Sequence, residues 1–242
     1  LGNPPWERIK LQEQEFFAAR DPDIAGAPNA AARKKLIKDL ADRQPNLLAE
    51  FYAAKRQADG ESHFIRNSGR YPLCGRGDVN TYSIFAETDR SLLGERGRLG
   101  VILPAGIATD ATTQHFFSDV VRKEALASLI HFENESLVFP NVHHAFKFLL
   151  LVLVGRQVHL EAAEFAFFVR DASQLARPET LFAVSPQEIQ LLNPNTGTCP
   201  VFRSRRDAEI TLGITQAPVG DPDRSPRAHP DRSLHQPAVP DR

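Results

Sequence analysis

The sequence contains no methionine, only two cysteines and one tryptophan, and its formal net charge is −1 over 242 residues. Cys74 and Cys199 lie far apart, which excludes a disulfide framework and a cysteine-rich zinc site and fits a reducing cytosol. The nearly balanced charge excludes a general electrostatic attraction to nucleic acid or membranes, so any DNA contact has to come from local basic patches. No amino-terminal signal peptide is present, and a cytoplasmic location is expected.

Long apolar runs are also missing. The longest, Phe146 to Val154, is interrupted by Lys147 and is too short to span a bilayer as a helix, so no membrane partner is expected. With 42% hydrophobic and 24% charged residues, the composition is typical of a globular protein with one sizeable core or two small ones. A complete reading frame normally begins with methionine, and its absence predicts a fragment shortened at the amino end.

Close to its start the chain carries Asn3-Pro4-Pro5-Trp6, a combination suited to binding a planar amino group. The Asn side-chain oxygen and the carbonyl of the first proline can each accept one N–H, and proline stiffens the pair by locking φ. Two such hydrogen bonds favour the tetrahedral nitrogen of a transition state. The indole offers a face for a base swung out of a duplex, worth roughly 1–3 kcal/mol. Asn-Pro-Pro is also ordinary turn chemistry, and a plain turn is the alternative.

The expected elements alternate between helices and strands. Leu1-Gly2 are interpreted as the end of a strand, which places the tetrad at the carboxyl edge where open α/β sheets bind ligands. Apolar residues at helical spacing predict helices from residue 12 to about residue 60. After a glycine-rich connection, we predict helices at 80–93 and about 113–127 and strands at 99–104, 129–132, 146–154 and 164–169. We expect the last two strands to form an antiparallel pair at the sheet edge.

This pattern predicts an α/β fold, the latter half of a Rossmann-like domain, over residues 1–191, with a helical insertion at about 12–67. Residues 192–216 change character and are interpreted as a linker toward a missing target-recognition domain, made of a polar loop with a basic cluster and a short helix at 207–212. Residues 217–242 repeat Pro-Asp-Arg and are too polar to form a core, so we predict a disordered tail. Their abrupt onset also resembles an out-of-frame translation.

Several segments in a fixed order resemble one family. They are the tetrad, Gly77–Phe85, Gly97–Pro104, Phe132–Glu135, Phe139–His143, Phe146–Phe148 and Asn193–Thr196. Together they resemble the adenine-specific DNA methyltransferases of the Eco57I type, which belong to restriction-modification systems and are often fused to a nuclease. The resemblance covers approximately residues 1–212. It implies an S-adenosylmethionine-dependent enzyme that methylates adenine-N6 in double-stranded DNA by direct displacement.

The resemblance also implies roles for the tetrad. Asn3 and the Pro4 carbonyl would hold the amino group, Pro5 would shape the loop, and Trp6 would stack the flipped adenine. Asn rather than Ser at position 3 favours adenine over cytosine.

The resemblance assigns two further groups of residues. Phe146 or Phe148 would form a second aromatic wall, although an aromatic residue in an apolar strand is usually part of the core. Asp78, Asn80 and Tyr82 would lie near the cofactor, but helix capping explains Asp78 and Asn80 equally well.

In this family, the glycine-rich loop that holds S-adenosylmethionine, and the acidic residue for its ribose, precede the catalytic loop. Neither stands before Leu1, so the resemblance implies that this chain lacks most of the cofactor site and is inactive alone.

Two other groups of residues carry side chains that are able to bind phosphate or metal. Arg203, Arg205 and Arg206 are candidate DNA-binding residues, because guanidinium groups match phosphate geometry, and a solvated linker is the alternative. His143 and His144 are neighbours without a carboxylate or cysteine at ligand spacing, so no metal site is expected.

Two other functions stay open. A protein-glutamine N5 methyltransferase uses the same tetrad on a similar planar amide, but the long helical segment and the arginine-rich linker fit that function poorly. A non-catalytic DNA-binding or assembly fragment, in which the fold persists without chemistry, is the second.

Overall fold

The computed structural model describes residues 1–216, and the predicted disordered tail lies outside the described residues. Its centre is a mixed five-stranded sheet with the strand order β1-β3-β2-β4-β5. β2 and β4 are parallel, and the other neighbouring pairs are antiparallel. The strands are β1 (Arg98–Pro104), β2 (Leu126–Glu133), β3 (Lys147–Val154), β4 (Ala163–Val169) and β5 (Phe182–Val184). The chain therefore has a mixed α/β fold.

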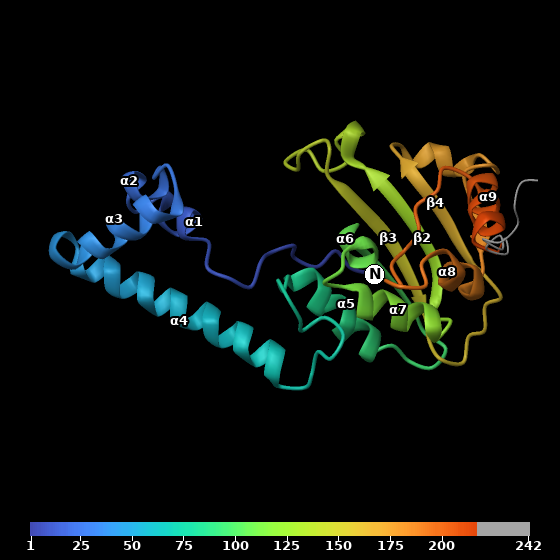
Figure 1. Cartoon of the computed structure of the whole chain (residues 1–242), viewed down its shortest axis with the longest axis horizontal. Coiled ribbons are helices and arrows are strands. Elements are labelled where there is room, and N and C mark those ends of the chain that lie inside the picture. Colours follow the sequence, from blue (N-terminus) through green and yellow to red (C-terminus); the bar gives the residue numbers. More distant parts are fainter. Residues whose placement is uncertain (217–242) are drawn as a thin grey trace, which may run out of the picture.

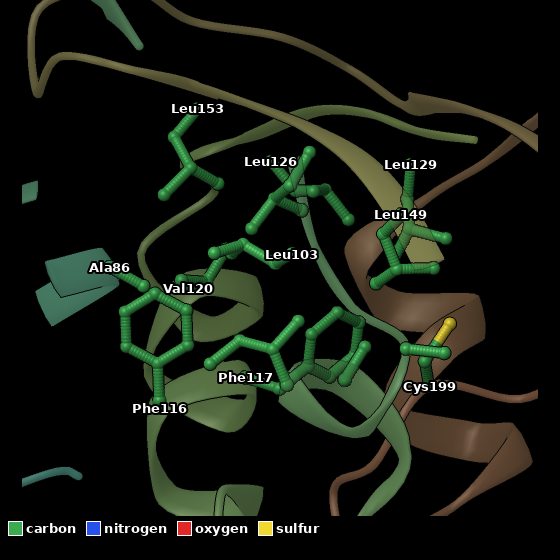
Figure 2. Close-up of a cluster of buried hydrophobic side chains, with 14 of the residues drawn as sticks. Ala86, Leu103, Phe116, Phe117, Val120, Leu126, Leu129, Leu149, Leu153 and Cys199 are labelled. Carbon is green, nitrogen blue, oxygen red and sulfur yellow. The ribbon is translucent and has the colours of Figure 1, made fainter. Parts of the chain in front are cut away.

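Helices cover one face of this sheet (Figure 1). They are α5 (Thr81–Ser91), α6 (Gly106–Thr109), α7 (Gln114–Arg122) and α8 (Pro186–Leu192), with α9 (Arg205–Gln216) beside α8. Figure 2 shows Phe116, Phe117 and Val120 of α7 packed with leucines of the sheet. Local sequence fixes the helix starts, since Asn80 caps α5 and Ser185 forms a capping box with Glu188 at α8.

The opposite face of the sheet carries a smaller apolar cluster. Ile130, Phe132, Phe148, Ala166 and Val169 are buried there. Two short 3₁₀ turns follow strands, η1 (Asn134–Ser136) after β2 and η2 (Ala172–Ala176) after β4. The sheet is therefore packed on both faces, as its apolar strands require.

Four helices form a lobe that extends away from the sheet (Figure 1). They are α1 (Glu13–Ala18), α2 (Pro22–Ala25), α3 (Ala30–Arg43) and α4 (Pro45–Asn67). The lobe has its own buried cluster, made of Phe17, Ile24, Ile37, Leu40 and Phe51. Among residues 1–216, no helix combines the length and the apolar character needed to cross a membrane.

The predicted pairing of the last two long strands was wrong. β3 does not pair with β4, but lies between β1 and β2, antiparallel to both. β3 is apolar on both faces, which suits a central strand, whereas an edge strand leaves backbone groups unpaired. Phe146 precedes this strand instead of beginning it, and the helix expected to continue to residue 127 ends at Arg122.

The short helix predicted at 207–212, within the segment interpreted as a linker, is part of the longer α9 (Arg205–Gln216). α9 buries Ala208 and Leu212, and its Arg205 bonds to the backbone of β5 and to Glu188 of α8. At least this part of residues 192–216 is therefore packed against the sheet domain.

Candidate functional site

The tetrad leaves the sheet at the edge where β1 and β2 end. The Gly2 N–H donates to the Gly100 carbonyl, and the Ile102 N–H donates to the Gly2 carbonyl, both at 3.0 Å. Gly2 is thereby paired parallel with β1. β1 and β2 are each antiparallel to β3 and so point the same way. Residues 3–6 consequently follow the carboxyl end of a short paired segment, which is a common ligand position in α/β sheets.

The start of α5 holds the loop in place through Thr81. The Thr81 hydroxyl donates to the Pro5 carbonyl at 2.6 Å and accepts from the Glu7 N–H at 2.9 Å. The Thr81 N–H also donates to the Glu7 carbonyl at 2.8 Å. Three hydrogen bonds to one residue fix the backbone on the carboxyl side of the tetrad.

The two acceptors predicted to bind an amino group are free among the described residues. Neither the Asn3 side chain nor the Pro4 carbonyl makes a hydrogen bond within residues 1–216, whereas the next carbonyl, that of Pro5, is occupied by Thr81. Asn3 is exposed and Pro4 is buried. The loop thus has one side-chain and one backbone acceptor without a partner at consecutive positions of the sequence.

Trp6 lies between two phenylalanines of the β2–β3 loop. Its ring stacks on Phe146 with centroids 5.6 Å apart and planes 13° from parallel, and it meets Phe139 edge-on at 5.7 Å. The Trp6 Nε1 is buried and has no hydrogen-bond partner among the described residues. The indole itself is half-buried at the junction of the two apolar clusters of the sheet.

The two phenylalanines proposed as a second aromatic wall have different surroundings. Phe146 is 37% exposed and touches Trp6. Phe148 is 3% exposed and stacks on Phe132 within the core. The geometry therefore brings Phe146, and not Phe148, to the tetrad.

A pocket of about 890 Å³ opens beside the tetrad, within the size range of small-molecule sites. Trp6, Phe146, Asn80 and Tyr82 line it, together with residues of α1 and α4. Asp78 is exposed and does not line it. Of the three predicted cofactor residues, Asn80 and Tyr82 therefore share a cavity with Trp6.

Asn80 and Tyr82 also contribute to the local structure of α5. The Asn80 Oδ1 accepts from the Tyr82 N–H at 3.3 Å and so caps α5, which leaves its amide nitrogen without a partner among the described residues. Burial, with a further contribution from the Asp110 charge, raises the pKa of Tyr82 to about 12, so its hydroxyl stays protonated and can donate.

Asp110 and Pro104 line the same pocket, and sequence reasoning missed both. A Cβ at Gly106 would overlap the Asp110 carboxylate and would approach the Tyr82 hydroxyl to 3.3 Å. Gly106 therefore permits a close approach of these groups. The available signal was position, because Pro104 ends β1 and Asp110 follows α6, the short helix after β1.

The three candidate DNA-binding arginines are not equivalent. Arg205 donates to the Ala183 carbonyl at 2.8 Å and to Glu188 at 2.7 Å, so it joins α9 to β5 and α8. Arg206 is exposed and lies 3.5 Å from Glu209. Arg203 is exposed, and its side chain makes no ion pair within residues 1–216.

The histidine pair lies on the surface of the β2–β3 loop. His144 lies 3.3 Å from Glu135, and the Nδ1 of His143 accepts from the Ala145 N–H at 3.2 Å. Within residues 1–216, no group of three or more His, Cys, Asp or Glu side chains is arranged to hold a metal ion.

No protein-family model and no curated protein matches this chain. Solved structures similar to it include the type IIG restriction endonuclease BpuSI, with 14% identity and a TM-score of 0.39 over 60% of this chain and 18% of the endonuclease. A type I restriction-modification methyltransferase subunit from Streptococcus thermophilus shares 13% identity, with a TM-score of 0.42 over 57% of this chain and 34% of the subunit.

A third similar structure comes from work on the complex assembly and conformational transition of the type I restriction-modification system. It shares 11% identity, with a TM-score of 0.41 over 57% of this chain and 37% of the other. The chain thus spans between 18% and 37% of the length of these three proteins. At such low scores and identities the similarity carries no functional argument, and the function has to be argued from the site.

Proposed function

We propose that this chain is part of the catalytic domain of an S-adenosylmethionine-dependent DNA adenine-N6 methyltransferase of a restriction-modification system. The observation that carries the proposal is the pair of acceptors, the Asn3 side chain and the Pro4 carbonyl, which make no hydrogen bond among the described residues and directly precede Pro5 and Trp6 at the carboxyl edge of the sheet; Trp6 lines the neighbouring pocket, and Asn3 and Pro4 do not. Thr81 fixes the carboxyl side of this loop, which supports a preorganised site.

The chemistry required is activation of a weak nucleophile. The lone pair of the adenine amino group is delocalised into the ring, and an acceptor for each N–H favours the tetrahedral nitrogen that forms during methyl transfer. Preorganised hydrogen bonds of this kind are worth about 3 kcal/mol each in other enzymes. Asn3 and Pro4 supply one acceptor each, and the stiff Pro-Pro backbone lowers the cost of orienting them.

Trp6 and Phe146 would form the site of the flipped base. Their rings already stack on each other, so a base that entered between them would require the rings to separate to about twice the aromatic stacking distance. Phe146 is partly exposed and stands outside β3, so it is the ring that moves in this proposal. Stacking of the base on these rings would contribute roughly 1–3 kcal/mol to the free energy of binding.

The pocket residues fit part of S-adenosylmethionine. A sulfonium cation is stabilised by aromatic faces and by a carboxylate, and the cavity presents Trp6, Phe146 and Asp110. Asn80 and Tyr82 add a free amide nitrogen and a protonated hydroxyl that would bind polar groups of the cofactor. When bound, S-adenosylmethionine would supply the electrophilic methyl group.

The experiment compares adenine methylation in genomic DNA from cells expressing the full-length gene in its wild-type form or with Asn3→Ala, using methylation-sensitive sequencing. We expect adenine methylation at one sequence motif in wild type, and a loss of at least about 100-fold in the variant, because one preorganised hydrogen-bond acceptor is removed. Asn46→Ala, an exposed change in the first turn of α4, is the matched control and should leave methylation unchanged.

The outcomes separate the alternatives. Unchanged methylation in Asn3→Ala would overturn the role of Asn3. Absence of DNA methylation in wild type, together with methylated glutamine in cellular proteins, would favour the protein-glutamine methyltransferase. DNA binding without methylation of either kind would favour the non-catalytic fragment.

A further inference from the structure

Asn134 is a fully buried polar residue at the point where β2 gives way to the β2–β3 loop. Its side-chain nitrogen donates to the Phe139 carbonyl at 3.0 Å and to the Val142 carbonyl at 2.9 Å. Its side-chain oxygen accepts from the Phe139 N–H at 3.0 Å. The side-chain amide of Asn134 therefore forms hydrogen bonds with three backbone groups of the loop, and both of its polar atoms have partners.

The β2–β3 loop, to which Asn134 is hydrogen-bonded, carries both phenylalanine rings that contact Trp6. Phe139 is bonded to Asn134 through its N–H and its carbonyl. The Phe146 carbonyl accepts from the Asn134 backbone N–H at 3.0 Å. The edge contact of Phe139 with Trp6 therefore depends on the Asn134 side chain, whereas the stacked contact of Phe146 is supported only by the backbone of residue 134.

The tip of the loop adds little to its stability. Leu137 and Val138 are more than half exposed, and Leu137 adopts a φ of +51°, which is uncommon for a residue other than glycine. The loop is therefore held at its base, by the hydrogen bonds of the Asn134 side chain and by the packing of Phe139 on Trp6 and Phe148.

We propose that Asn134 is a positioning residue that sets one side of the aromatic wall of the target-base site by fixing Phe139 against Trp6; the assignment of that wall to a base rests on the proposed function. Asn134 does not touch the base in this proposal. It acts through the loop, and loss of its side chain should free Phe139 from Trp6 while the sheet stays folded.

The first test uses Trp6, the only tryptophan of the chain, as a spectroscopic probe. In Asn134→Ala, we expect red-shifted emission and stronger quenching by acrylamide, since the opening equilibrium of the loop should rise about tenfold when its buried partner is lost. Asn141→Ala, an exposed change in the same loop, is the matched control and should leave the Trp6 spectrum unchanged. A native spectrum in a folded Asn134→Ala protein would overturn the proposal.

A second measurement needs no variant and covers the case in which Asn134→Ala fails to fold. In the wild-type protein, the Phe139 amide is bonded to the Asn134 side chain, whereas the Asn141 amide has no partner among the described residues. We expect hydrogen exchange at Phe139 to be at least about tenfold slower than at Asn141. Equal exchange rates would show that the loop is not held, and would overturn the proposal.

Methylation separates this proposal from the proposed function. If wild type methylates adenine, the full-length Asn134→Ala enzyme should show a raised KM for DNA with a smaller change in kcat, because a displaced Phe139 weakens base binding while the acceptors Asn3 and Pro4 stay in place. If wild type methylates nothing, the proposed function fails, while the Trp6 spectrum and the exchange rates still decide whether Asn134 positions Phe139.

Discussion

At the scale of single residues, Thr81 has the most direct control over the tetrad. Its hydroxyl lies between the Pro5 carbonyl and the Glu7 N–H, so it ties the amino-terminal loop to the first turn of α5. Neither partner belongs to a helix or a strand, and no other residue within 1–216 bonds to these two groups. The position of Asn3 and Pro4 therefore depends on a hydroxyl far away in the sequence.

Replacing Thr81 by valine keeps the shape of the side chain and removes the hydroxyl. We expect a loss of about 1–3 kcal/mol in unfolding free energy, because two backbone groups lose their partner, and this is measurable by urea denaturation. Thr88→Val on the same helix is the control. The Thr88 hydroxyl donates to the Ile84 carbonyl within α5, so its removal should cost less. Equal losses in the two variants would contradict a special role of Thr81.

How much of the site could be predicted from the sequence differs from residue to residue. The chemistry of Asn3 and Pro4 followed from side-chain type and proline stiffness, and the structure leaves both acceptors free. The sequence could not separate Phe146 from Phe148, because only the register of β3 decides which ring is buried. Asp110 was missed because its place in the pocket depends on the turn after β1, which Gly106 shapes.

At the scale of elements, a buried carboxylate joins the two helices that cover the sheet. Asp119 of α7 lies 2.8 Å from Arg90 of α5 and also pairs with Arg122 and Lys123. Burial opposes the charge of Asp119, but the hydrogen bonds from Arg122 and the charge of Arg90 outweigh it and hold the pKa of Asp119 below its usual range. The pair fixes α7 relative to α5, whose first turn carries Thr81 and Asn80.

This lowered pKa predicts a pH-dependent stability. Above the ordinary carboxyl range, near pH 4, Asp119 is charged in both states and contributes its full stabilisation, which is lost as the pH falls through the lower native pKa. Asp119→Asn should cost about 3 kcal/mol at neutral pH and progressively less in acid. Urea unfolding across pH measures this. The exposed change Glu124→Gln is the control, and the difference in its stability from wild type should not shrink in acid. A cost of Asp119→Asn that stayed constant at all pH values would contradict the assignment.

The order of the strands in the sheet could not be predicted from the periodicity of apolar residues alone. The strands themselves were predicted from apolar runs, but β3 was assigned to the edge with β4. Pairing depends on how the chain returns after β2, and the β2–β3 loop brings β3 back against β2 on the side of β1. The apolar run that follows Lys147 in β3 was a signal for a central position, since such strands are buried on both faces.

At the scale of the whole molecule, the pocket lies where two separately packed parts meet. The lobe cluster shares no residue with the two clusters of the sheet, although Ile65 near the end of α4 packs in the main cluster of the sheet. The pocket draws Tyr82 and Asp110 from the sheet domain and Phe16 and Glu61 from the lobe. Loosening of the lobe should therefore open the pocket without unfolding the sheet.

Leu40→Ala tests this separation. Leu40 is fully buried in the lobe cluster, and its truncation should cost about 2–5 kcal/mol locally. We expect amides of α1 to α3 to lose protection in hydrogen exchange while those of β3 keep theirs, because the lobe opens as its own unit. Leu151→Ala, a matched truncation in the centre of β3, should instead lower protection throughout the sheet. If Leu40→Ala lowered protection in β3 as much as in α3, the two parts would form one cooperative unit, and the pocket could not open by movement of the lobe alone.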